Sequence, residues 1–89
     1  MFVVATHDIS DPQKFREIAE TAAAEGMDLP DGVTLHGSFP NTAASRCVCL
    51  WQADSVDAIR EVVEAALGAA AVNEYYEVGS DLAIGLPTG

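Results

Sequence analysis

The sequence is poor in basic residues. Four Lys and Arg residues stand against fourteen Asp and Glu residues, and the formal net charge is −10. Nucleic acids and anionic membrane surfaces are both bound through clustered Lys and Arg, and this sequence contains no such cluster. We therefore expect no nucleic-acid or membrane partner. The acidic residues are spread along the chain, which is typical of a solvated surface.

The sequence also lacks a long apolar run, although 49% of its residues are hydrophobic. A membrane-spanning helix needs about 20 consecutive apolar residues. The first residues, MFVVATHDISD, have neither the basic start nor the small-residue cleavage site of a signal peptide. These features predict a soluble, cytoplasmic protein with a single domain over residues 1–89. So short a chain buries a limited share of its surface, which favours pairing with a second copy.

Signatures of common chemistry are missing. The chain has no G-x-x-x-x-G-K-[ST], G-x-G-x-x-G, G-x-S-x-G or H-E-x-x-H motif, so phosphate and dinucleotide binding have no support. The two cysteines, Cys47 and Cys49, form a single C-x-C rather than the paired C-x-x-C spacing of strong zinc sites. A disulfide between residues so close on one strand would be strained. We expect two reduced thiols that behave as small apolar residues on a half-buried sheet face.

What is present is a regular alternation of strand and helix patterns. Asp11 caps a first helix that ends at Gly26, and Asp54 or Ser55 caps a second helix that ends at Gly68. Strands are predicted over residues 2–7, 33–39, 46–52 and 71–78. The order βαββαβ predicts an α+β, ferredoxin-like fold, in which two helices cover one face of a four-stranded antiparallel sheet with strand order 4-1-3-2.

Apolar residues set the predicted register of the two middle strands. Residues opposite each other share a face of the sheet. Matching Val33, Leu35 and Phe39 with Val48 and Leu50 places Leu35 near Leu50, and this face is predicted to pack under the helices.

The other face is predicted to line a pocket. Its tryptophan, thiols and histidine are unlike a solvated sheet face, so we expect a second copy to cover it sheet to sheet and to enclose a cavity. Tyr75, on the last strand, joins this set. The predicted pocket-lining residues are Thr34, His36, Ser38, Cys47, Cys49, Trp51 and Tyr75.

The two histidines lead to a metal-site hypothesis. On the predicted register His36 lies opposite Cys49, and His7 or Glu77 would complete the site. Imidazole, thiolate and carboxylate ligands suit nickel, zinc or copper. The alternative is that each histidine makes local hydrogen bonds and that Glu77 is solvated. No spacing in the sequence enforces the metal site, so both interpretations stay open.

Three stretches carry a resemblance that covers nearly the whole chain. VTLHGSFP, CVCLWQADSVDAIREVVE, and NEYYEV with a terminal AIGLP resemble small uncharacterised bacterial proteins of the dimeric α/β-barrel superfamily. The resemblance implies a homodimer whose two sheets form a barrel around a central pocket. Members of the superfamily include cofactor-independent monooxygenases, haem-degrading enzymes, stress-response proteins and nickel-binding proteins, and the resemblance supplies no catalytic residue set for this chain.

Three functions follow as hypotheses. The leading one is a small protein that binds a partly apolar ligand or a transition metal in a dimeric barrel. The second is a monooxygenase-like enzyme with His36 as base and with Trp51 and Tyr75 orienting the substrate. The third is a structural or protein-interaction module.

The C-terminal residues 79–89 are predicted to form an arm. Leu82, Ile84 and Leu86 alternate with small residues, so an extended segment would present three large side chains on one surface. We expect this arm to cross to the second copy.

Overall fold

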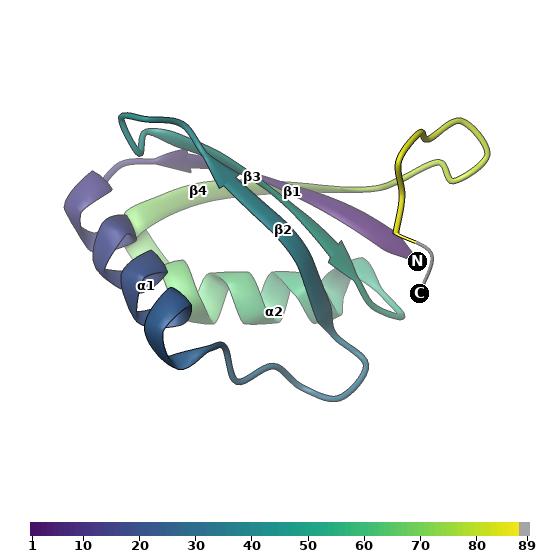
Figure 1. Ribbon diagram of the computed structural model, residues 1–89, viewed down its shortest axis with the longest axis horizontal. Coiled ribbons are helices and arrows are strands. Elements are labelled where there is room, and N and C mark those ends of the chain that lie inside the picture. Colours follow the sequence, from purple (N-terminus) through teal and green to yellow (C-terminus); the bar gives the residue numbers. More distant parts are fainter. Residues whose placement is uncertain (88–89) are drawn as a thin grey trace.

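The computed structural model describes residues 1–87 (Figure 1). Its elements are β1 (Phe2–Ile9), α1 (Pro12–Glu25), β2 (Thr34–Pro40), β3 (Arg46–Gln52), α2 (Val56–Leu67), a short 3₁₀ turn η1 (Gly68–Ala70) and β4 (Ala71–Glu77). The predicted order βαββαβ is confirmed, and the predicted element ends lie close to the observed ones.

The helix ends follow local chemistry. The side chain of Asp11 accepts a hydrogen bond from the backbone N–H of Lys14, and Pro12 begins α1, where no amide donor is needed. Ser55, rather than Asp54, caps α2, because its side chain accepts a hydrogen bond from the backbone N–H of Ala58.

The four strands form one antiparallel sheet in the order β2-β3-β1-β4, which is the predicted order. Both helices lie on the same side of this sheet (Figure 1). Val3 from β1 and Ile59 from α2 are fully buried between the two layers, and Phe15 from α1 is also buried. The predicted α+β, ferredoxin-like fold is therefore confirmed.

The predicted register of β2 and β3 is wrong. Leu35 pairs with Trp51, not with Leu50, and Cys49 pairs with Ser38. The register shifts between Leu35 and Gly37, so His36 lies in a bulge of β2. A bulge inserts one extra residue into one strand, and it changes which residues of the two strands share a face.

Pairing with β1 shows which face of β3 is buried. The three pairs are Val3 with Trp51, Ala5 with Cys49, and His7 with Cys47. All six residues are buried. The face that carries Cys47, Cys49 and Trp51 therefore packs under the helices, the reverse of the prediction. The indole of Trp51 buries more apolar surface than Leu50, so burial of this face is favoured.

The other face of the sheet has no cover among residues 1–87. Phe39 and Val72 are 66% and 69% exposed, and Val48 and Tyr76 are exposed as well. We call this surface the open face. Its exposed apolar side chains stand beside charged Asp8, Arg46 and Glu74, and the contact with a second copy stays a prediction.

The predicted extended arm is wrong in its conformation. The backbone N–H groups of Leu82 and Ala83 both donate to the carbonyl of Gly79, at 3.0 and 3.1 Å, which closes a turn. Leu82 and Ile84 are largely exposed, whereas Leu86 is partly buried. Residues 88 and 89 of the predicted arm lie outside the described residues, and the contact with a second copy stays a prediction.

The model also bears on membrane insertion. Over residues 1–87, neither helix has the length and apolar character that crossing a membrane requires.

Candidate metal centre

Three side chains with metal-ligand chemistry meet on the helix side of the sheet. His7 comes from β1, and Cys47 and Cys49 come from β3. One ligand atom from each residue lies within 4.8 Å of the other two. All three side chains are buried, with exposures of 3%, 5% and 7%. The pairing of two adjacent antiparallel strands brings these residues together, because His7 lies directly opposite Cys47.

The hydrogen bonds of His7 define which ring nitrogen is free. Its Nδ1 lies 2.6 Å from Oδ1 of Asn73, and the amide nitrogen of Asn73 donates to the carboxylate of Glu64. Because a carboxylate only accepts, the amide oxygen of Asn73 must face His7. Nδ1 of His7 therefore carries the proton and donates it, and Nε2 keeps its lone pair. Metal-binding histidines are commonly held by such a hydrogen bond from the other ring nitrogen.

The two thiols are close enough to share a proton. The Sγ atoms of Cys47 and Cys49 are 3.8 Å apart. The hydroxyl of Ser38 lies 3.5 Å from Sγ of Cys47 and 3.3 Å from Sγ of Cys49. The hydrogen bond from Cys49, supported by one from Ser38, outweighs burial and lowers the pKa of Cys47 to about 6. The same hydrogen bond, together with burial, raises the pKa of Cys49. A thiolate at Cys47 is therefore favoured, and the thiolate is the form that binds metals.

The first prediction concerns these thiols in metal-free protein. We expect one of the two to ionise well below the ordinary value of 9.0, because a lowered pKa means that the anion forms at lower pH. Thiolate absorbance near 240 nm, followed against pH, measures this without any reagent entering the buried site. In Cys49→Ala, Cys47 loses its main hydrogen-bond donor, so its titration should move to higher pH. A single transition near pH 9 for both thiols of the unaltered protein would contradict the shared proton.

The predicted metal set is only partly assembled. His7 and Cys49 meet as proposed, and Cys47, predicted only to line the pocket, completes the cluster. His36 lies on the open face, where Nε2 is 2.9 Å from Oε1 of Gln52 and the ring is 5.6 Å from that of Phe2. Glu77 is exposed at the end of β4. The position of His36 follows from the bulge in β2, which separates it from the thiols.

The sheet divides the predicted pocket-lining residues between its two faces. Thr34 and His36 lie on the open face. Ser38, Cys47, Cys49, Trp51 and Tyr75 lie on the helix side. The catalytic arrangement with His36 as base beside Trp51 and Tyr75 is therefore wrong. Burial, and then the negative charge of Glu64, raises the pKa of Tyr75 to about 12, so this phenol is neutral near pH 7.

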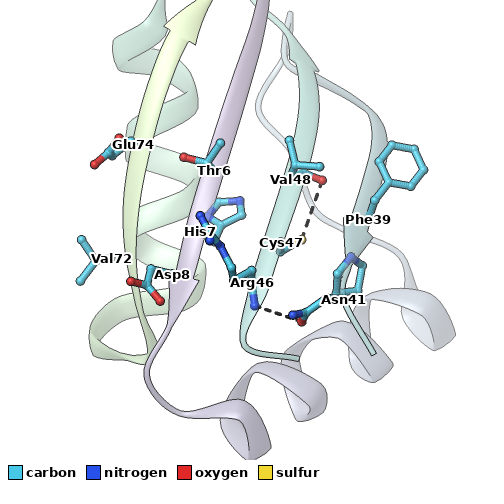
Figure 2. Close-up of a pocket in the computed structure, with 11 residues that line it drawn as sticks. Thr6, His7, Asp8, Phe39, Asn41, Arg46, Cys47, Val48, Val72 and Glu74 are labelled. Atoms are coloured by element: carbon cyan, nitrogen blue, oxygen red, sulfur yellow. Dashed lines mark hydrogen bonds between the residues drawn. The ribbon is translucent and has the colours of Figure 1, made fainter. Parts of the chain in front are cut away.

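A hollow lies on the open face (Figure 2). Its volume is about 420 Å³. Figure 2 shows Val48 and Phe39 at the right and Val72, Glu74 and Asp8 at the left, with Thr6 and Arg46 between the two groups. Phe39 and Val72 are exposed, so this hollow is a shallow surface rather than an enclosed site.

Comparison with known proteins places the chain in a family. Residues 1–65 match the model of the domain of unknown function DUF3303. This range holds all three residues of the metal cluster and extends from β1 into α2, whereas Asn73 lies beyond it. No curated protein and no solved structure matches the chain. The match covers well over half of the sequence, so the chain belongs to the DUF3303 family.

Proposed function

We propose that this domain binds one zinc ion through His7, Cys47 and Cys49. The observation that carries the proposal is the spacing of the two sulfur atoms. Thiolates bound to zinc at about 2.3 Å in tetrahedral geometry lie about 3.8 Å apart. The Sγ atoms of Cys47 and Cys49 are 3.8 Å apart before any metal is added. The thiols therefore need little movement to bind the ion.

The ligand types support zinc over the other metals considered. Two thiolates and one imidazole suit zinc and copper(I), whereas nickel(II) commonly takes a square-planar set of nitrogen and oxygen ligands. Three protein ligands leave a fourth zinc position for water or another molecule, as in zinc sites that bind substrates. Asn73 and Glu64 act behind His7, where they hold its ring in the orientation and tautomer that a metal needs.

Metal analysis of the purified protein tests this proposal directly. We expect one zinc ion per chain after addition of zinc and gel filtration, measured by elemental analysis against protein concentration. Cobalt(II) in place of zinc should give a thiolate-to-cobalt absorption band and the visible bands of a tetrahedral site. Protein that retains no zinc and binds cobalt without a thiolate band would contradict the proposal. Preferential retention of copper(I) would show that the metal is copper rather than zinc, bound by the same ligands.

We also propose that two copies pair through the open face. The support is the group of exposed apolar side chains on this face, Phe39, Val48, Val72 and Tyr76. Several exposed apolar side chains on one face of a small domain favour association. The dimeric α/β-barrel arrangement would use this face, and the observed fold is compatible with it.

The dimer leads to a second prediction. Val72→Asp places a carboxylate on the open face of a chain whose net charge is already −10, so repulsion and lost apolar contact should shift the protein toward monomer in analytical ultracentrifugation. Ala23→Asp adds the same charge to the exposed part of α1 and should leave the dimer intact. An unaltered protein that sediments as a monomer at micromolar concentration would contradict the pairing.

Deletion of residues 80–89 tests the tail separately. If the tail contacts the second copy, the dimer should dissociate more readily after the deletion, because the exposed side chains of Leu82 and Ile84 are lost. An unchanged dissociation constant of the dimer would show that the tail makes no contact with the second copy.

A further inference from the structure

A partly open hollow on the helix side of the sheet has the features of a ligand site. A cavity of about 280 Å³ lies between α1, α2 and the buried face of β2 and β3. Its walls are mainly apolar and include Phe15, Ile18, Met27, Leu35, Val62 and Leu67. Cavities that bind small molecules are commonly walled by such side chains, with a few polar groups at one point.

Two lining residues give this cavity hydrogen-bonding groups that a ligand could use. His7, Ser38 and Cys49 all line it. Because Nδ1 of His7 donates to Asn73, its Nε2 is left as an acceptor. The hydroxyl of Ser38 both donates and accepts. A group that donates one hydrogen bond and accepts another would satisfy these two side chains together.

Trp51 provides an independent observation. It lines the same cavity and is only 3% exposed. Its Nε1–H has no acceptor among the described residues. A buried indole donor usually has a partner, so a missing acceptor at a cavity wall points to one that is supplied from outside the chain.

We infer that the cavity binds a small, uncharged, apolar alcohol. A cavity of 150 Å³ holds benzene, so this larger one has room for about ten non-hydrogen atoms. A hydroxyl group can donate to the acceptor at His7 and can accept from Ser38 or from the unpaired donor of Trp51. No Lys or Arg lines the cavity, so a carboxylate would lose hydration without a counter-charge. The alcohol would use the same ring nitrogen of His7 as the proposed zinc ion, so the inference concerns the metal-free protein.

Three probes of similar size test the head group. Benzyl alcohol, toluene and benzoate share one ring and differ in the group that would meet His7 and Ser38. Binding to metal-free protein is measured by isothermal titration and by methyl chemical shifts of Met27 and Leu35. We expect benzyl alcohol to bind about fivefold or more tightly than toluene, the effect of one net hydrogen bond, and benzoate not to bind measurably. Equal binding of benzyl alcohol and toluene would overturn the choice of an alcohol.

A matched pair of variants tests the location. Ala22 lines the cavity, whereas Ala23 is its exposed neighbour on α1. Ala22→Leu should fill part of the space and lower the affinity for benzyl alcohol at least tenfold. Ala23→Leu should bind benzyl alcohol with unchanged affinity. Ala66→Leu, on the opposite wall, repeats the test if Ala22→Leu does not fold. Equal affinities in Ala22→Leu and Ala23→Leu, with both folded by circular dichroism, would overturn the site. Because no metal is present, failure here leaves the zinc proposal intact, and failure of zinc binding leaves this inference intact.

Discussion

Replacement of Cys47 by serine is expected to weaken zinc binding by about a hundredfold or more. A serine hydroxyl at this position stays protonated near neutral pH and is a poor zinc ligand, whereas the thiolate is the form that zinc binds. The comparable loss of a hydrogen-bonded partner behind a metal ligand costs about 10–100-fold, so loss of the ligand itself should cost at least as much. Competition with a chromophoric chelator at fixed pH measures the dissociation constant.

The two histidines supply the control for this experiment. His7→Gln should lower zinc affinity to a similar extent, because the imidazole of His7 is lost from the cluster. His36→Gln removes a histidine that lies on the open face and bonds to Gln52, so zinc affinity should not change. If His36→Gln lowers zinc affinity as strongly as His7→Gln does, zinc is bound by a different set of residues and the proposed centre is wrong.

Asn73→Leu provides a graded test of the same centre. The variant keeps the three ligands and removes the acceptor that holds the Nδ1 proton of His7. We expect about a tenfold loss of zinc affinity with the ligand set unchanged, as judged by the cobalt spectrum. Unchanged affinity would show that the ring needs no support from Asn73.

Truncation of Trp51 to alanine should be the most destabilising substitution proposed here. Trp51 is 3% exposed, on the inner strand β3 and beneath the helices. Replacing a buried aromatic residue by alanine costs about 3–5 kcal/mol, which is a large share of the 5–15 kcal/mol by which small domains are stable. On the predicted register Trp51 would instead affect the dimer more than the fold. The structure reverses that expectation.

Urea unfolding of Trp51→Ala and Tyr76→Ala separates the two interpretations. Tyr76 lies on the open face and is 58% exposed, so its truncation should cost the folded monomer roughly 1 kcal/mol or less. Trp51→Ala should lower the unfolding midpoint strongly while the fraction of dimer among folded molecules stays the same. A Trp51→Ala variant that keeps its unfolding midpoint and only fails to dimerise would show that Trp51 acts at the interface between copies.

Sequence alone determined the elements and their order. Asp11 and Pro12 at the start of α1, and Gly68 after α2, act through local hydrogen bonds and backbone preferences, so their effects can be read without tertiary contacts. The order βαββαβ then admits few sheet topologies, and the predicted strand order was the observed one.

Only the tertiary structure decided which face of the sheet is buried. Side chains alternate along a strand with a period of two, so one extra residue exchanges the faces of everything beyond it. The bulge at His36 is such a residue, and the local signal for it is Gly37, because an isolated glycine inside a strand often marks a bulge. Matching Leu35 with Leu50 therefore placed the thiols on the wrong face. The metal cluster arises from pairing between β1 and β3, which joins His7 to cysteines forty and more positions away, and sequence spacing does not report such a contact.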